Sequence, residues 1–183
     1  MPARPEDRAR ETIDRQLAAA GWVVQDSRAM NLYAGTGVAV REYPLKWGPA
    51  DYLLFVDREA IGIVEAKKEG VTLTGVELQA EKYSEGVPSG VPAPIKPLPF
   101  LYQSTGVETR FTNRLDPECR SRPVFNFHRP ETLASWVAAD PIWLSENHRL
   151  NGRPAGFRLR VQQLPELRPD GLWPEARPNV PAD

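Results

Sequence analysis

The sequence predicts an α/β fold in which a central mixed β-sheet is flanked by α-helices. Residues 5–20 place apolar side chains at helical spacing, whereas residues 52–56 and 60–64 are short apolar runs of the length of buried β-strands. Segments of both kinds recur along the 183 residues, of which 41% are hydrophobic and 26% charged. That composition is typical of one globular domain.

The first helix is expected over residues 5–20, with Gly21 as its end. Its apolar stripe consists of Ala9, Ile13, Leu17 and Ala20. Glu6 lies on the same face, two turns before Ile13. It is either an extra metal ligand or an acid that complements the helix dipole, and the second interpretation is the more usual one. Residues 38–45 are then expected to form a strand, followed by a turn at residues 46–49.

The two apolar runs within residues 48–70 are separated by residues 57–59, which are short and polar. The runs are therefore expected to form an antiparallel hairpin with a three-residue loop. In that register Asp51 lies directly opposite Glu65, and Lys67 points to the same face as Glu65. Two carboxylates and one ammonium group then meet at one end of an apolar hairpin.

Opposed carboxylates repel each other, and a hard divalent cation with oxygen ligands compensates for that repulsion. The apolar pattern does not set the register, because both faces of the hairpin are apolar. A loop of two or four residues would send Glu65 to the other face. The alternative interpretation is a buried hairpin whose polar residues lie at its frayed end.

A second helix is predicted over residues 74–85, because Thr74 and Glu77 have the spacing of a capping box. Gln79 lies within its apolar face, one turn before Tyr83. The two side chains are either structural or directed at the carboxylates, where an amide and a phenol can hold a water or a phosphate oxygen.

Residues 87–99 contain five prolines and are expected to be a long loop. A second hairpin is predicted around residues 104–106, and a short helix over residues 131–139. The most basic local region lies between the two, at Arg110, Arg114, Arg120, Arg122 and Arg129. These arginines either contact a phosphate backbone or form a solvated structural face.

Composition excludes several classes of function. The net charge of −1 provides no global field for nucleic acid, and the single cysteine, Cys119, excludes a disulfide framework and a multi-cysteine metal site. No apolar run has membrane-spanning length, and no phosphate loop for ATP is present. His128 and His148 lack ligand spacing, so both are expected to be structural. A domain over residues 1–163 is expected, followed by a proline-rich linker over residues 164–183.

The hairpin and the helix after it resemble the PD-(D/E)xK nucleases. Asp51 is followed by Glu65-Ala66-Lys67, and then by Gln79 and Tyr83 at the spacing of the QxxxY motif of the RecB-like branch. The longer stretches GPADYLLFVDREAIGIVEAKKEG, PFLYQSTGVETRFTN and VFNFHRPETLASW are similar to the N-terminal endonuclease domain of type I restriction enzyme R subunits, over about residues 5–140.

The sequence departs from that family in two respects. Ala50 precedes Asp51 where the family has proline, and Pro49 stands one step earlier. Such R subunits also continue into an ATP-driven DNA translocase motor, so the chain is expected to be a fragment or an excised domain of a longer protein.

The resemblance implies a restriction-endonuclease-like core that hydrolyses phosphodiester bonds of double-stranded DNA with Mg²⁺, with Mn²⁺ as a substitute and with little sequence specificity of its own. It implies Asp51, Glu65 and the Ala66 carbonyl as metal ligands. The same two carboxylates would act in catalysis together with Lys67, Gln79 and Tyr83. Contacts with DNA are expected from Lys68, Arg114, Arg120 and Arg122.

Further expectations concern the assembly. The resemblance implies modification and specificity subunits as partners, ATP only through the motor domain, and a cytoplasmic location, which the single cysteine also fits. Three alternatives remain: a docking module without chemistry, a DNA-binding module without chemistry, and a different PD-(D/E)xK restriction or repair nuclease.

Overall fold

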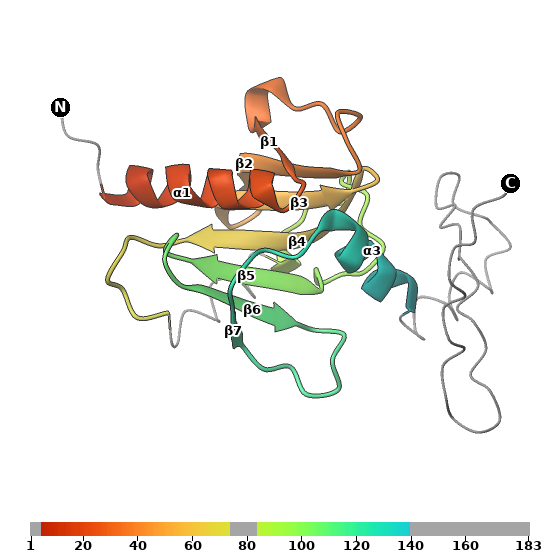
Figure 1. Cartoon of the computed structure of the whole chain (residues 1–183). Helices are drawn as coiled ribbons and strands as arrows, with labels where there is room; N and C mark the ends of the chain where they lie inside the picture. Colours follow the sequence, from red (N-terminus) through yellow and green to blue (C-terminus); the bar gives the residue numbers. More distant parts are fainter. Residues whose placement is uncertain (1–4, 74–83, 140–183) are drawn as a thin grey trace, which may run out of the picture. The chain divides into compact units, whose positions relative to one another are not determined.

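The computed structural model describes residues 5–73 and 84–139, all within the first of two units, Met1–Arg153. In these residues seven strands form one mixed sheet whose spatial order follows the chain order (Figure 1). The pairs β1–β2 and β4–β5 are parallel and the others antiparallel. The predicted α/β fold with a mixed sheet is confirmed.

The elements follow one another as α1 (Pro5–Ala19), β1 (Val23–Asp26), a 3-10 turn η1 (Ser27–Ala29), β2 (Gly37–Leu45), β3 (Gly48–Val56), β4 (Glu59–Ala66), β5 (Phe100–Ser104), β6 (Thr109–Asn113), β7 (Arg122–Val124) and α3 (Pro130–Ala139). The first helix, the second hairpin and the last helix are close to their predicted bounds. The predicted turn at residues 46–49 was too long, because Gly48 and Pro49 already pair with β2. Strand β7 was not predicted, since its three residues carry no apolar alternation.

The two faces of the sheet are covered differently. Tyr52, Val64 and Tyr102 lie on the face against which α1 and α3 pack, whereas Leu53 and Ile63 lie on the opposite face. The opposite face is closed by three residues of the proline-rich loop: Val87, Val91 and Leu98. Helices on both faces were expected, and the two described helices cover one face only. The predicted helix over residues 74–85 lies outside the described residues except for its last two.

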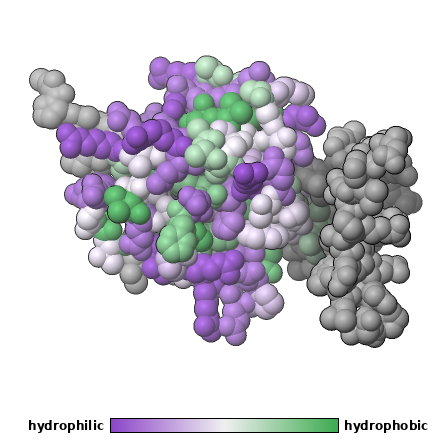
Figure 2. Space-filling model, in the orientation of Figure 1, coloured by the Kyte–Doolittle hydropathy of each residue, from purple (hydrophilic) through white to green (hydrophobic). Residues whose placement is uncertain are grey.

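The surface shown in Figure 2 is mostly hydrophilic, with small separate apolar patches. None of the described helices has the length and hydropathy of a membrane span. The predicted boundary between residues 163 and 164 lies outside the described part of the chain.

An aromatic cluster around His128 joins α3 to the sheet. The Tyr102 hydroxyl lies 2.6 Å from His128 Nδ1, and the ring of His128 packs against Phe111 and Trp136 with centroids 4.5 and 5.0 Å apart. The indole of Trp22 donates to the His128 carbonyl at 2.9 Å. The His128 backbone N–H also donates to the Tyr102 oxygen at 3.3 Å, so Tyr102 contacts both the ring and the backbone of His128. His128 is structural, as expected.

This arrangement makes the stability of the chain depend on pH. Burial lowers the pKa of His128 below its ordinary value of about 6.5, and the charge of Arg122 lowers it further. The unfolded chain therefore binds a proton more readily than the folded chain, and the free energy of unfolding falls as the pH drops through that ordinary value toward the lowered pKa. Urea unfolding across this window should show the fall in the wild type and a smaller fall in His128→Asn.

The chain has two histidines, and the second, His148, lies outside the described residues, so His148→Asn is measured alongside to separate its contribution to the pH dependence from that of His128. A His128→Asn variant whose unfolding free energy varied with pH as steeply as that of the wild type would contradict the expectation.

Candidate active site

The loop between β3 and β4 differs from the prediction. It has two residues, Asp57 and Arg58, where three were expected, and both have positive φ angles of 47° and 74°. Paired positive φ angles are typical of the tight turns that join antiparallel strands, because their twist matches that of the strands. Next to this turn, Phe55 pairs with Ala60 while Leu54 pairs with Gly62, so Ile61 is an extra residue in β4. It forms a β-bulge.

The bulge restores the predicted register beyond it. Tyr52 lies opposite Val64, as it would with a three-residue loop, and one step further Asp51 and Glu65 share a face of the sheet. The two-residue turn without the bulge would send Glu65 to the other face. The Ala66 backbone N–H donates to Asp51 Oδ2 at 2.9 Å, which fixes the Asp51 carboxylate against the end of β4. The predicted juxtaposition is therefore present, although the predicted loop length was wrong.

Glu65 is the buried acid of this site, with 4% of its surface exposed. The Lys67 ammonium group donates to Glu65 Oε1 at 2.8 Å, so the predicted approach of Lys67 to Glu65 is present. Burial raises the pKa of Glu65 above its ordinary value. The hydrogen bond from Lys67 opposes that rise, and the charge of Asp51 adds to it. The second carboxylate oxygen, Oε2, is buried and has no hydrogen-bond partner among the described residues.

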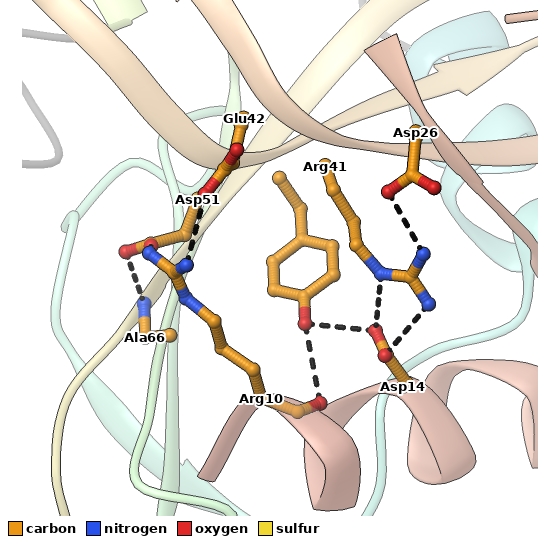
Figure 3. Close-up of polar contacts among 8 residues, drawn as sticks. Arg10, Asp14, Asp26, Arg41, Glu42, Asp51 and Ala66 are labelled. Atoms are coloured by element: carbon orange, nitrogen blue, oxygen red, sulfur yellow. Dashed lines mark hydrogen bonds and ion pairs between the residues drawn. The ribbon is translucent and has the colours of Figure 1, made fainter. Parts of the chain in front are cut away.

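Arg10 is a site residue that the sequence analysis missed. Its guanidinium group donates to Asp51 Oδ1 at 2.5 Å and to Glu42 Oε1 at 3.0 Å, and so links α1 to β2 and β3 (Figure 3). Arg10 follows Glu6 by one helical turn, but an arginine on an amphipathic helix is ordinarily a solvated residue. The 41 residues that separate it from Asp51 leave no local pattern by which the contact could be found.

A second polar cluster holds the same helix in place. Asp14, one turn after Arg10, accepts from the Tyr52 hydroxyl at 2.8 Å and from two nitrogens of Arg41 at 3.1 and 2.7 Å (Figure 3). Arg41 also donates to Asp26 at 3.1 Å. The pKa of Tyr52 is raised, first by burial and then by its hydrogen bond to Asp14. These contacts fix the rotation of α1 and thereby direct Arg10 toward Asp51.

The other predicted site residues are placed as follows. Lys68 is exposed. Arg114 donates to Ser84 at 3.3 Å, while Arg120 and Arg122 form ion pairs with carboxylates at 2.7 and 3.5 Å. The partners of these two arginines are Glu118 and Asp116, which lower the positive charge that they present. Gln79 and Tyr83 lie outside the described residues, so their predicted approach to the carboxylates stays a prediction.

The donor set at the end of the hairpin fits a hard divalent cation. Asp51, Glu65 and the backbone carbonyl of Ala66 offer oxygen atoms, which Mg²⁺ prefers, and Glu65 Oε2 is a buried acceptor without a donor among the described residues. In the described part of the chain no three His, Cys, Asp or Glu side chains form a metal-binding group. Two carboxylates would therefore need the carbonyl and water as further ligands. Both oxygens of Asp51 are engaged, so a cation at Oδ1 would have to displace Arg10.

Three comparisons show which known proteins the chain is similar to. Residues 6–96 match the family described as the second domain of the type I restriction enzyme EcoKI endonuclease subunit. The chain is 24% identical over 196 residues to the EcoKI endonuclease subunit of Escherichia coli strain K12, an alignment that covers 78% of this chain and 17% of that protein. The matched residues include Arg10, Asp51, Glu65 and Lys67.

A solved structure supports the fold. The fragment structure of an HsdR subunit of a type I restriction enzyme from Vibrio vulnificus YJ016 superimposes with a TM-score of 0.56 at 21% identity. The superposition covers 75% of this chain and 26% of that chain. The chain thus spans about a sixth of the EcoKI subunit and about a quarter of the Vibrio vulnificus chain.

The contact between Arg10 and Asp51 leads to a prediction about charge compensation. Replacing Arg10 by methionine leaves the half-buried Asp51 carboxylate without its cation. We expect Arg10→Met to lower the free energy of unfolding of the metal-free chain by about 1 kcal/mol, because a hydrogen bond to a charged group is lost and solvent screens part of the effect. Urea unfolding in the presence of a chelator measures this, and added Mn²⁺ should recover the lost stability.

Arg15→Met is the matched control, because Arg15 lies on the same helix, is exposed, and bonds within the helix only. Equal effects of the two substitutions would show that the Arg10–Asp51 contact contributes nothing specific.

Proposed function

The chain is related to the N-terminal endonuclease domain of type I restriction enzyme R subunits, and we propose on this basis that it is a Mg²⁺-dependent endonuclease domain acting on double-stranded DNA. One observation carries the proposal. Asp51, Glu65 and Lys67 meet on one face at the end of the hairpin, with a buried Glu65 oxygen that lacks a donor among the described residues. Metal-dependent hydrolysis of a phosphodiester needs oxygen ligands of this kind, which hold the divalent cation in place. Mn²⁺ is expected to substitute for Mg²⁺.

We assign each of these residues a role in the proposed reaction. Asp51, Glu65 and the Ala66 carbonyl would hold the cation, which would supply a water of lowered pKa and positive charge beside the phosphate oxygens. Lys67 is held beside the cation site by Glu65 at 2.8 Å. Its ammonium group either orients the attacking water or stabilises the charge that develops on the phosphate. Gln79 and Tyr83 are assigned to positioning the water or the scissile phosphate.

The proposal extends to the complex in which such a domain works. Lys68, Arg114, Arg120 and Arg122 are proposed to contact the DNA backbone, which carries no sequence information. Sequence specificity would then come from modification and specificity subunits, and ATP would act only through a motor domain. We place this assembly in the cytoplasm.

A docking module without chemistry is the second candidate function. It is favoured by one feature of the site: Arg10 and the Ala66 N–H together engage both oxygens of Asp51. A site that never binds a cation would look the same. The two candidates differ in whether a divalent cation binds at Asp51.

We expect Asp51→Asn and Lys67→Ala to reduce nicking of supercoiled plasmid in Mg²⁺ or Mn²⁺ by at least about 100-fold, as is typical when one transition-state contact is removed. Asp51→Asn should also abolish binding of Mn²⁺ measured by calorimetry, which does not require a motor domain or partner subunits. Thermal unfolding should show that both variants remain folded.

Glu59→Gln serves as the matched control, since Glu59 is a partly buried acid at the opposite end of β4. It should leave nicking and Mn²⁺ binding unchanged. Equal Mn²⁺ binding by the wild type and Asp51→Asn would remove the basis for the nuclease and favour the docking module.

A further inference from the structure

Gln103 is a buried polar residue to which the proposed mechanism assigns no role. It lies on β5, with 3% of its surface exposed, and pairs with Glu65 of β4 in the parallel part of the sheet. Paired residues on neighbouring strands are about 4.8 Å apart and direct their side chains to the same face. Asp51, Glu65 and Gln103 therefore form one row across three neighbouring strands.

Two acceptor oxygens in this row have no hydrogen-bond partner among the described residues: Glu65 Oε2 and Gln103 Oε1. A buried acceptor without a donor costs free energy, and two of them at paired positions are rarely left in a folded protein. Because both atoms are acceptors, a further acceptor cannot satisfy them. A water or a hydrated cation between them can.

The charges at the site favour a hydrated cation. Three carboxylates, those of Glu42, Asp51 and Glu65, face the two cationic groups of Arg10 and Lys67. These five groups together leave one negative charge uncompensated. Lys67 is bound to Glu65 Oε1, whereas the single charge of Arg10 is shared between Asp51 and Glu42, so the uncompensated charge lies on the Asp51 side of this row.

We propose that Gln103 belongs to the divalent-cation site, where its Oε1 accepts a hydrogen bond from a water bound to the cation that Glu65 holds. Mg²⁺ dehydrates reluctantly and keeps several waters, which need acceptors in the surrounding protein. Gln103 is thus a positioning residue that orients the hydration shell. This inference rests on the proposed cation site at Asp51 and Glu65, and it adds a residue to that site from a strand outside the hairpin.

The test compares Mn²⁺ binding with the stability of the metal-free chain. Free Mn²⁺ is counted by its electron paramagnetic resonance signal during titration, and urea unfolding is measured in chelator. We expect Gln103→Leu to weaken Mn²⁺ binding by about tenfold, as is common for residues that orient metal ligands. Its urea midpoint without metal should be equal to or higher than that of the wild type, because an unpartnered buried amide has been removed.

Two further variants sharpen the test. Gln103→Glu adds a carboxylate to the row and should bind Mn²⁺ more tightly than the wild type. Gln16→Leu is the matched control, since Gln16 Oε1 also lacks a partner among the described residues, but its amide donates to the carbonyl of Gly106, which lies against Ala9 and Thr12 of α1. It should lower the urea midpoint and leave Mn²⁺ binding unchanged.

Each other outcome overturns the inference. A Gln103→Leu chain with a lower urea midpoint and unchanged Mn²⁺ binding would show that a protein group bonds the amide, including a rotated amide that donates to Glu65. The proposed nuclease would then stand without Gln103. If Gln103→Leu does not fold, a Gln103→Glu chain with no gain in Mn²⁺ affinity is equally decisive. A wild type that binds no Mn²⁺ would refute both the inference and the proposed function.

Discussion

The register of the β3–β4 hairpin is the constraint on which the candidate site depends. Side chains alternate between the faces of a strand, so a slip of one residue would carry Glu65 away from Asp51. The tight turn at Asp57 and Arg58 shifts the pairing register by one residue, and the bulge at Ile61 shifts it back. Bulges often occur next to functional sites, where they redirect a side chain. Here two local irregularities together place the two carboxylates on one face.

The second feature is that one carboxylate is compensated locally and the other from an element distant in the sequence. Glu65 is buried and bound by Lys67 of its own segment, whereas Asp51 is bound by Arg10 of the N-terminal helix. The helix can supply Arg10 only because Asp14, one turn later, is bound to Tyr52 and to β2. The polar contacts between α1 and the sheet thus support the position of Arg10 beside Asp51.

The stretches that carry the family resemblance have different physical roles. In the segment around His128, the imidazole and Trp136 pack against Phe111 of β6 and hold α3 to the sheet. Pro130 of the same segment fits against Gly37, where a Cβ atom would come within 2.1 Å of the proline ring. The segment containing Gln103 instead adds a polar side chain to the row of carboxylates. Similarity in the first segment therefore bears on the fold, whereas the second segment contributes both to this packing, through Tyr102 and Phe111, and to the row of carboxylates.

The sequence by itself determined the α/β class and the main strands and helices, because apolar periodicity and turn residues act over a few neighbouring positions. It predicted the approach of Asp51, Glu65 and Lys67 only for one of several possible registers. It did not determine the loop length or the bulge, since both faces of the hairpin are apolar and many registers bury them equally well. The contact of Arg10 with Asp51 and the pairing of Gln103 with Glu65 are determined only by the tertiary structure. Their partners lie about 40 residues away, across a helix packing and a parallel strand pairing that no local pattern encodes.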